Sequence, residues 1–495
     1  MRMADQHTIE VDHATAFELM ERAGHAVADA VIRYAQDGGR VVVLIGSGNN
    51  GGDGFVAARL LRLKRIPVTA IPLVPIEDLK GDTAKQLKLA QQAGVKIRPA
   101  VNSDDLGHLE DWLKRAVIVV DAIFGTGLDR PLTGWIAEAV ECINCCDRSV
   151  LAVDIPSGIN TDSGEALGSA IKADFTLPIA AYKWGHWLNP GRDFAGKLLP
   201  PAPIGIADAT LDAMMEKHPS AVASSYLINR EMIKSAFPER HENAHKNEFG
   251  HLWIFGGSQG FTGAPRLASM GAQAVGTGLV SICCPNSVYP IIASSSLEVM
   301  VHPQESAPWQ SATTLVVGPG WGKEHSRMLA ELLLSDVPCV LDADALNMLS
   351  DQPKLSEILK RRDALVVMTP HPGEAGRLLG ISAAEVQKNR LAAALALVEK
   401  YETWVVIKGA QTLTVSPDRH VWLCPFGSPR LAVAGTGDVL AGMIGGLLAV
   451  GISPDVAIPA AVGLHAVAGE QGGWHRAGQL EDVVAEFVRQ FRELS

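Results

Sequence analysis

Short runs of valine, isoleucine and leucine, each followed by a helical stretch, recur along most of this chain. In the first half the runs occupy residues 41–45, 68–73, 117–121 and 150–154. They do not alternate between apolar and polar side chains, which is typical of strands that helices cover on both faces. An apolar stripe at helical spacing between Leu19 and Val31 predicts another helix on the same sheet. We therefore expect a parallel α/β sheet.

The same alternation restarts after Tyr226, beyond a segment rich in proline and glycine. The strands expected in this second half lie near residues 252–255, 279–284, 314–317, 339–342, 364–369 and 404–408. A chain of 495 residues is long enough for two large domains with separate cores. We expect one α/β domain over residues 1–212, a linker over 213–223 and a second α/β domain over 224–495.

The charge balance excludes one class of partner. There are 43 Lys and Arg against 54 Asp and Glu, a net charge of −11, and an acidic surface repels phosphate backbones, so no nucleic-acid partner is expected. Residues 1–7 lack an apolar export segment, and the apolar run 439–452 falls short of the roughly 20 residues that span a bilayer. Several of the seven cysteines lie in apolar runs. We therefore expect a cytoplasmic protein with reduced thiols and no membrane contact.

A glycine-rich segment follows the first expected strand. Five of the nine residues 46–54 are glycine, and the segment leads into a helix expected from Phe55. Backbone amides in such a segment suit a phosphate. The spacing also matches a dinucleotide fingerprint, but residues 73–75 provide no acidic side chain for a ribose, which disfavours a redox NAD site. A plain strand–helix connection is the alternative interpretation.

Polar side chains follow three of the expected strands. Asn50 stands in the glycine-rich segment, Asp121 ends the third strand, and Asp154 and Ser157 follow the next. The carboxyl ends of parallel strands meet at one edge of a sheet, so these side chains are expected to converge there. A partly desolvated carboxylate can act as a general acid or base, or bind a cation. Each aspartate alone could equally be a helix cap.

These segments resemble the YjeF N-terminal family, the NAD(P)H-hydrate epimerases, over roughly residues 8–212. The resemblance rests on residues 46–54, 121–131 and 154–158. It implies a Rossmann-like three-layer domain that interconverts R and S forms at C6 of a hydrated nicotinamide ring, with Asp121 transferring the proton. It implies a potassium site formed by Asn50, Asp121 and Ser157. The implied substrate-binding residues are Asn49, Asn50, Gly51, Gly52, Asp53, Gly125, Thr126, Gly127, Leu128, Asp129, Arg130, Pro131 and Asp154.

The most specific motif of the second half is Ala434-Gly435-Thr436-Gly437-Asp438, followed by an apolar helix. Amides of residues 435–437 at a helix N-terminus would bind a phosphoryl group, and Asp438 beside them could deprotonate an attacking hydroxyl. A glycine turn with an aspartate cap is the alternative. Further polar segments follow expected strands, at residues 318–322, 341–347, 369–374 and 406–412.

Together with residues 256–264, these segments resemble the ribokinase-like fold and, more narrowly, the YjeF C-terminal family of ADP/ATP-dependent NAD(P)H-hydrate dehydratases, over roughly residues 224–493. The resemblance implies phosphorylation of the ring hydroxyl of the S hydrate by ADP or ATP with Mg²⁺, then loss of phosphate, with Asp438 as the base. The implied hydrate site is lined by Ala264, Gly320, His371 and Asp438. The implied nucleotide-binding residues are Lys408, Gly409, Ala410, Gln411, Thr412, Gly435, Thr436 and Gly437. Trp321 and Phe261 depart from the family pattern.

We therefore interpret the chain as a bifunctional repair enzyme for hydrated NADH and NADPH that acts as a homo-oligomer. The alternative is a ribokinase-like kinase for a small alcohol or vitamin precursor, fused to a non-catalytic nucleotide-binding module. Two metal-like patterns are weaker. His241-x-x-x-His245 has charged neighbours instead of the apolar face of a zinc helix, and Cys142, Cys145 and Cys146 lack a second cysteine pair.

Overall fold

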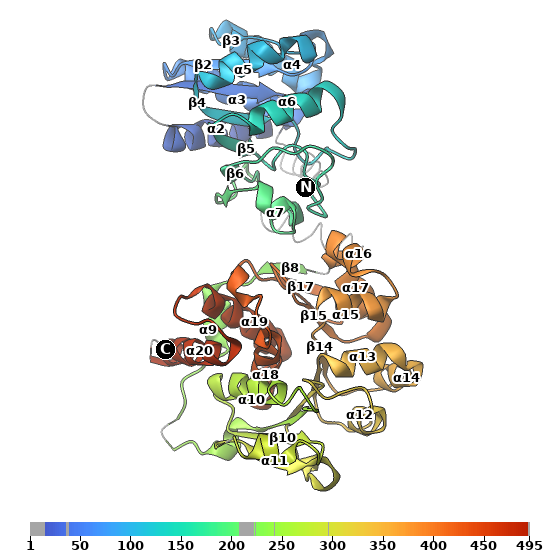
Figure 1. Ribbon diagram of the computed structural model, residues 1–495. Helices are drawn as coiled ribbons and strands as arrows, with labels where there is room; N and C mark the ends of the chain where they lie inside the picture. Colours follow the sequence, from blue (N-terminus) through green and yellow to red (C-terminus); the bar gives the residue numbers. More distant parts are fainter. Residues whose placement is uncertain are drawn as a thin grey trace. The chain divides into compact units, whose positions relative to one another are not determined.

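The computed structural model describes residues 15–35, 39–206, 222, 224–241, 243–295 and 297–493. The chain divides into two compact units, Met1–His218 and Pro219–Ser495, each built around its own sheet (Figure 1). Apart from residue 222, the linker expected over 213–223 lies outside the described residues.

A seven-stranded sheet forms the centre of the N-terminal unit, in the order β3-β2-β1-β4-β5-β6-β7. Every neighbouring pair of strands is parallel. The four expected strands are present as β1, β2, β4 and β5, and three short strands extend the sheet toward its edges. The strands are β1 (Arg40–Ile45), β2 (Val68–Pro72), β3 (Lys96–Ile97), β4 (Ala116–Ala122), β5 (Ser149–Val153), β6 (Phe175–Leu177) and β7 (Lys197–Leu198).

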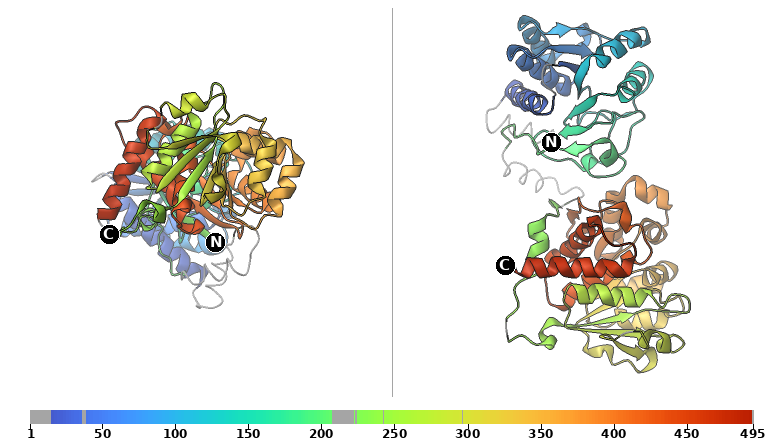
Figure 2. Two further views of the ribbon diagram at one scale, coloured as in Figure 1. Left: turned by 90° about the horizontal axis from the view of Figure 1, so that it is seen from below. Right: turned by 60° about the vertical axis from the view of Figure 1, so that its left-hand side comes forward.

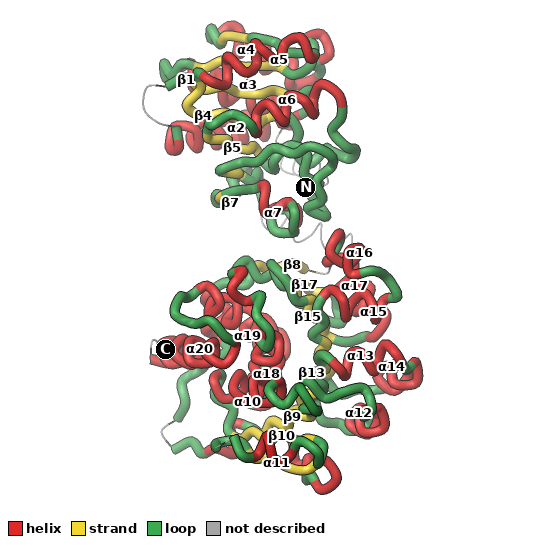
Figure 3. The backbone as a smooth tube through the Cα atoms, in the orientation of Figure 1, coloured by secondary structure: helices red, strands yellow, loops and turns green. Residues whose placement is uncertain are grey.

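Helices cover both faces of this sheet, so the unit has three layers (Figure 3). One core lies under α2, α3 and α4 and includes Val27, Phe55 and Leu87. A second core lies under α5 and α6 on the opposite face and includes Leu109 and Ile143. The expected parallel three-layer architecture is confirmed. The helices are α2 (Ala16–Tyr34), α3 (Asn49–Leu63), α4 (Gly81–Gln92), α5 (Leu106–Lys114), α6 (Gly134–Asn144) and α7 (Gly191–Phe194).

One helix begins earlier than expected. Residues 49–54 form the first turns of α3, so the prediction that the helix starts at Phe55 was wrong. The glycines there allow the start of α3 to pack closely against neighbouring parts of the chain. A Cβ at residue 51 would lie 2.0 Å from the carbonyl oxygen of Gly46, and one at residue 52 would lie 2.4 Å from the sulfur of Met20. The backbone amides of the glycine-rich segment therefore lie at the N-terminus of α3.

The C-terminal unit contains a ten-stranded sheet in the order β11-β10-β9-β12-β13-β14-β15-β16-β17-β8. β16 is antiparallel to both of its neighbours, and all other pairs are parallel. The six expected strands are β9, β10, β12, β13, β14 and β15, whereas the other four were not predicted. The strands are β8 (Ser224–Leu227), β9 (His251–Phe255), β10 (Leu279–Cys284), β11 (Met300–Pro303), β12 (Thr314–Val317), β13 (Cys339–Leu341), β14 (Val366–Met368), β15 (Trp404–Ile407), β16 (Leu413–Val415) and β17 (His420–Leu423).

Two groups of helices enclose this sheet. On one face, α9, α10, α18, α19 and α20 surround a core that includes Leu252, Ile444 and Leu464, and α10 lies along α20 (Figure 2). Helices α12 to α17 lie on the other side of the sheet (Figure 1). The helices are α9 (Arg230–Ser235), α10 (Ala264–Ala274), α11 (Tyr289–Ala293), α12 (Ser326–Leu333), α13 (Asp344–Asp351), α14 (Pro353–Lys360), α15 (Pro372–Leu379), α16 (Ala383–Lys388), α17 (Arg390–Tyr401), α18 (Thr436–Ala449), α19 (Pro454–Glu470) and α20 (Ala477–Glu493).

All seven cysteines are free thiols. In the described part of the chain, no helix is both long enough and apolar enough to cross a membrane.

Candidate active sites

Asp121, near the end of β4, is the most buried carboxylate of the N-terminal site, with no exposed surface. Its Oδ1 accepts hydrogen bonds from the Ser157 hydroxyl at 2.6 Å and the Ile123 amide at 3.2 Å, and its Oδ2 accepts one from the Ser157 amide at 2.8 Å. Burial raises the pKa of Asp121 to about 6, while these hydrogen bonds act in the opposite direction. The group can therefore change its protonation near neutral pH.

Asn50 and Asp154 approach one another beside Gly125. A Cβ at residue 125 would lie 3.3 Å from Asn50 Oδ1 and 3.4 Å from Asp154 Oδ2, so a larger residue would crowd both side chains. Asn50 is 8% exposed, and its Nδ2 has no hydrogen-bond partner among the described residues. The structure thus brings a buried amide and a buried carboxylate to the edge of the sheet where Asp121 lies.

Asp154 is held by two residues that the sequence reasoning missed. It adopts a left-handed backbone conformation, with φ 67°, and its carboxylate is paired with the Lys183 ammonium. The Nε2 of His186 lies 2.6 Å from the Asp154 carbonyl oxygen, while its Nδ1 accepts the Lys183 amide at 2.9 Å. Burial lowers the pKa of His186 to about 4, so its imidazole is neutral at pH 7.

The remaining N-terminal candidates divide between the helix and a surface turn. Asn49 is exposed, whereas Gly51, Gly52 and Asp53 are buried in the first turns of α3. In the turn that follows Gly125, Leu128 is buried in the core. The turn is otherwise half-buried at Thr126 and exposed at Gly127, Asp129, Arg130 and Pro131.

In the C-terminal unit, Asp438 lies in the first turn of α18. Gly435 precedes this helix in a left-handed conformation, with φ 95°, which favours glycine. Close packing fixes the helix: a Cβ at residue 442 would lie 1.8 Å from the carbonyl oxygen of Ala268 on α10. Burial, with Asp342 as the next cause, raises the pKa of Asp438 to about 7, and Lys408 opposes the rise.

Lys408 connects this helix to a group of carboxylates. Its Nζ lies 2.6 Å from Asp342 Oδ1 and 4.0 Å from Glu374 Oε2. A Cβ at residue 437 would lie 3.4 Å from the same Nζ, so the α18 N-terminus is close to the Lys408 ammonium. Thr369 donates a further hydrogen bond of 2.8 Å to Asp342 Oδ1. The structure therefore gathers one cation and several acids around the expected anion-binding amides.

Two of the expected hydrate-binding residues, Gly320 and Ala264 at the start of α10, lie beside each other. Gly320 has φ 58°, and a Cβ there would lie 3.1 Å from the Cβ of Ala264 and 2.8 Å from that of Phe261. His371 caps α15, accepting the Gly373 amide on Nδ1 at 2.9 Å. Burial, followed by the charge of Lys408, lowers the pKa of His371, so this imidazole is neutral at pH 7.

The expected nucleotide segment, residues 408–412, forms the turn between β15 and β16. Gly409 and Ala410 are exposed, and Thr412 donates a hydrogen bond of 3.0 Å to the Gly409 carbonyl oxygen. Gln411 has φ 51°, and its buried Oε1 has no hydrogen-bond partner among the described residues. The segment therefore presents backbone and small side chains to solvent.

Two further residues support the C-terminal site. His465 on α19 lies with Nε2 2.9 Å from the carbonyl oxygen of Thr436, and burial lowers its pKa to about 4. A single histidine within the apolar run of α19 was the only sequence signal for it. Trp321, an unusual residue for the family pattern, is fully buried, stacks on His325 and donates a hydrogen bond of 3.2 Å to Gln304 Oε1. Its ring therefore fills the core next to the glycine loop.

The two metal-like patterns have other contacts. His245 pairs with Glu248 at 3.1 Å, and Glu242 lies outside the described residues. Cys142, Cys145 and Cys146 are free. Across residues 15–35, 39–206, 222, 224–241, 243–295 and 297–493, there is no cluster of three or more His, Cys, Asp or Glu side chains placed to bind a metal ion.

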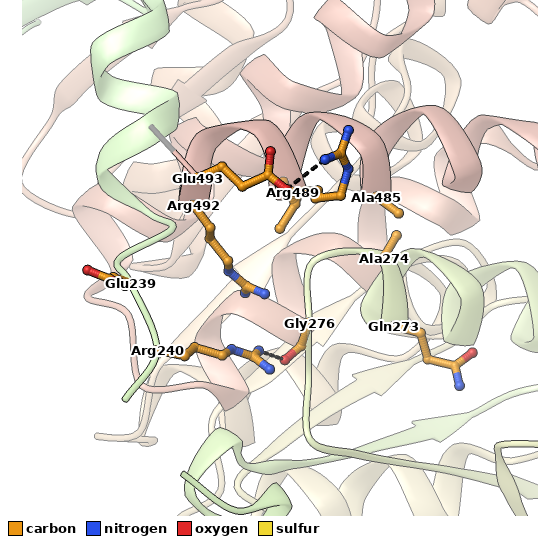
Figure 4. Close-up of a pocket in the computed structure, with 10 residues that line it drawn as sticks. Glu239, Arg240, Gln273, Ala274, Gly276, Ala485, Arg489, Arg492 and Glu493 are labelled. Carbon is orange, nitrogen blue, oxygen red and sulfur yellow. Dashed lines mark hydrogen bonds and ion pairs between the residues drawn. The ribbon is translucent and has the colours of Figure 1, made fainter. Parts of the chain in front are cut away.

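A cavity of about 580 Å³ lies in the C-terminal unit, between α10 and α20 (Figure 4), and its lining residues are not among those expected at the site of Asp438. Arg240 donates to the Gly276 carbonyl oxygen, and Arg492 donates to that of Val275 at 3.5 Å. The two guanidinium groups thus bind carbonyl groups at the C-terminal end of α10, which accounts for their position.

Comparison with known proteins identifies both units. Residues 16–185 match the family described as "YjeF-related protein N-terminus", and residues 252–477 match the family "NAD(P)H-hydrate dehydratase". The chain is 35% identical over 468 residues to a bifunctional NAD(P)H-hydrate repair enzyme of Coxiella burnetii, covering 92% of this chain and 91% of that protein. It is 32% identical over 462 residues to the enzyme of that name in Escherichia coli, covering 92% and 85%.

A crystal structure of the ADP/ATP-dependent NAD(P)H-hydrate dehydratase of Bacillus subtilis, co-crystallised with ATP and Mg²⁺, is also similar. It is 30% identical, covers 54% of this chain and 98% of that chain, and has a TM-score of 0.48. The matches to both family halves and to full-length relatives together show that the chain belongs to the family of bifunctional NAD(P)H-hydrate repair enzymes.

Proposed function

We propose that this protein restores hydrated NADH and NADPH to their active forms by two reactions. The N-terminal domain, residues 1–212, interconverts the R and S hydrates. The C-terminal domain, residues 224–495, dehydrates the S form while ADP becomes AMP, or ATP becomes ADP, with release of phosphate. The observation that carries this proposal is that one chain contains two sheet-edge sites, each with a buried carboxylate whose pKa is raised toward neutrality.

In the epimerase site, Asp121 is proposed to transfer the proton and Asp154 to bind the hydrated nucleotide, together with the turn 125–131 and the start of α3. A potassium ion fits the donor set, because Asn50, Asp121 and Ser157 offer amide, carboxylate and hydroxyl oxygens. Asp121 is also fully buried, and among the described residues its hydrogen bonds come from Ser157 and Ile123, so a cation would offset its charge. When bound, the ion would supply positive charge beside the substrate.

In the dehydratase site, Asp438 is proposed to remove the proton from the ring hydroxyl of the S hydrate. The amides of Gly435, Thr436 and Gly437 would bind the phosphoryl group during its transfer, while Ala264, Gly320 and His371 line the hydrate site. Residues 408–412 would hold the nucleotide, which is used with Mg²⁺. Phosphorylation converts a poor leaving group, hydroxide, into a much better one, phosphate, so the nucleotide supplies the free energy of dehydration.

The kinase alternative is not favoured. A small-alcohol kinase would use the same anion-binding amides and the same base, so the geometry of Asp438 alone does not distinguish the two reactions. The distinction comes from this chain's matches to both families and from relatives that are bifunctional NAD(P)H-hydrate repair enzymes by name. We also propose that the protein acts in the cytoplasm, where its free cysteines stay reduced, and as a homo-oligomer, which light scattering would test.

The decisive experiment adds the protein to a mixture of R and S hydrates and follows absorbance at the reduced-nicotinamide band. With ADP or ATP, Mg²⁺ and K⁺, we expect complete recovery, beyond the S fraction and faster than spontaneous epimerisation. Recovery that stops at the S fraction would remove the epimerase from the proposal. Formation of a stable phosphorylated alcohol without recovery would replace the dehydratase by the kinase.

A further inference from the structure

Arg390, the first residue of α17, is a buried cation whose two Nη atoms are unpaired within the described part of the chain. Only 4% of the residue is exposed. Neither Nη1 nor Nη2 of its guanidinium has a hydrogen-bond partner among the described residues. Burial lowers its pKa to about 10, so the group remains charged at pH 7. A buried cation without a counter-charge destabilises a fold, so the presence of Arg390 calls for a physical explanation.

Arg362, in the same unit, shows what a structural arginine looks like in this protein. Its guanidinium donates to the carbonyl oxygens of Leu332 at 3.1 Å and Leu333 at 2.7 Å, and also to those of Ser335 and Val337. This group closes the end of α12 by hydrogen bonding to its carbonyl oxygens. Arg390 has no such role, because neither Nη atom of its guanidinium has a partner in the residues that the structure describes.

The unpaired guanidinium lies directly beneath the nucleotide segment. A Cβ at Gly409 would lie 2.7 Å from Arg390 Nη1, so a side chain at this position would collide with the guanidinium. Gly409 itself is exposed, and its neighbour Gln411 has an unpaired buried oxygen. Gln411 in this turn and Arg390 on α17 therefore have buried hydrogen-bonding groups that no described residue satisfies.

The lysine of the nucleotide segment, Lys408, is already neutralised by an ion pair. Lys408, which immediately precedes Gly409, pairs with Asp342 at 2.6 Å and lies near the N-terminus of α18. The turn thus begins at a paired lysine beside the anion-binding amides, and its next residue, Gly409, lies over the guanidinium of Arg390. An extended anion such as a nucleotide polyphosphate matches this arrangement, since a guanidinium binds phosphate oxygens through two parallel hydrogen bonds.

We propose that Arg390 binds a phosphate group of the adenine nucleotide through Nη1 and Nη2, after the turn at Gly409 moves and exposes these two atoms, which are buried in this structure. This inference rests on the proposed use of ADP or ATP by the C-terminal domain. It adds a site residue that lies outside the motif segments, on the helix before β15. The nucleotide then supplies a counter-charge that the described residues do not offer to Arg390.

The test measures nucleotide binding rather than turnover, in the full-length protein with Mg²⁺. Titration calorimetry compares wild type, Arg390→Met and Arg362→Met, using ADP and, as a probe without phosphate, adenosine. We expect Arg390→Met to weaken ADP binding about 10- to 100-fold and to leave adenosine binding unchanged. Its melting temperature without nucleotide should equal or exceed that of wild type, because an unpaired buried charge is removed. Arg362→Met should melt at a lower temperature but bind ADP normally.

Unchanged ADP affinity in Arg390→Met would overturn this inference alone, as would equal losses for ADP and adenosine together with a lower melting temperature. Absence of ADP binding to wild type would instead overturn the proposed function, and this inference with it. If Arg390→Met does not fold, Arg390→Lys takes its place. A single ammonium cannot make the paired contacts, so its ADP affinity should fall several-fold while adenosine binding is retained.

Discussion

The Lys408 ammonium lies 2.6 Å from Asp342 Oδ1, and these two partners shift the pKa of Asp438 in opposite directions. Asp342 raises the pKa of Asp438, as burial does, and Lys408 lowers it. A carboxylate held near pH 7 by such a balance is suited to accept a proton from an alcohol and release it again. The ion pair therefore controls the proposed base without itself removing the proton.

The pH dependence of dehydration should follow this balance. Asp438 acts as a base only when ionised, so the rate with saturating nucleotide should rise with pH through about 7. Asp342→Asn removes a negative charge that raises the pKa, so the rising limb should move to lower pH. Lys408→Met should move the limb to higher pH and reduce the rate. Rates measured against pH for wild type, Asp342→Asn and Lys408→Met check this. Movement of the rising limb of Asp342→Asn to higher pH would contradict the role of Asp438 as the base.

Replacing either proposed base should slow only the reaction of its own domain. Asp121→Asn should slow consumption of the R hydrate about 10²- to 10⁴-fold, the range typical of a lost general base, while dehydration of the S hydrate continues at the wild-type rate. Asp438→Asn should do the reverse. Chromatography of both epimers over time measures the two rates separately. Wild-type consumption of the R hydrate by Asp121→Asn would show that another group transfers the proton.

Potassium should stabilise the N-terminal domain through the carboxylate of Asp121. Burial keeps this group costly to ionise, and an ion bound only by the folded state raises stability by about 2.7 kcal/mol at a hundred times its Kd. Calorimetric unfolding in KCl and in NaCl of equal ionic strength should therefore give a higher melting temperature in KCl. Asp121→Asn should lose that difference. Equal melting temperatures of wild type in the two salts would argue against the potassium site.

The sequence predicted what depends on local pattern. Runs of apolar residues gave the central strands of both sheets, because strands buried on both faces need no polar alternation. Asp121 and Asp154 were expected at the sheet edge because they follow these apolar runs, and the carboxyl ends of adjacent parallel strands lie together. The start of α3 was misplaced because glycine-rich segments are read as loops, whereas here Gly51 and Gly52 permit close helix packing.

Contacts between distant segments could not be predicted in this way. β8 precedes the first expected strand of its domain, yet it pairs with β17 across nearly two hundred residues of sequence. The same limit applies to Arg390 and Lys183. Their importance comes from what they lie beside in space, and their sequence neighbours carry no motif. A buried charge becomes recognisable only when its partner, or the absence of one, is seen.

The pair formed by Lys183 and Asp154 gives the clearest stability test. Only 7% and 10% of the two side chains are exposed, so removing one charge leaves the other buried without a partner. Lys183→Met should therefore destabilise the N-terminal domain by roughly 3–5 kcal/mol. The double variant Lys183→Met with Asp154→Asn should recover much of this loss, because neither charge remains and asparagine tolerates the left-handed backbone at this position. Lys114→Met breaks an exposed pair with Glu110 in the same domain and should leave stability unchanged.

Denaturant unfolding of the single and double variants, analysed as a double-mutant cycle, isolates the energy of the Lys183–Asp154 pair. A loss for Lys183→Met no larger than that for Lys114→Met would show that the ammonium does not hold Asp154 in place. A large coupling would show that Lys183 fixes a side chain proposed to bind the hydrated nucleotide. Since Ile179 also donates its amide to Asp154 Oδ1 at 3.1 Å, the carboxylate should keep part of its orientation even in the single variant. In Lys183→Met, the loss of free energy of substrate binding should then be smaller than the loss of free energy of unfolding.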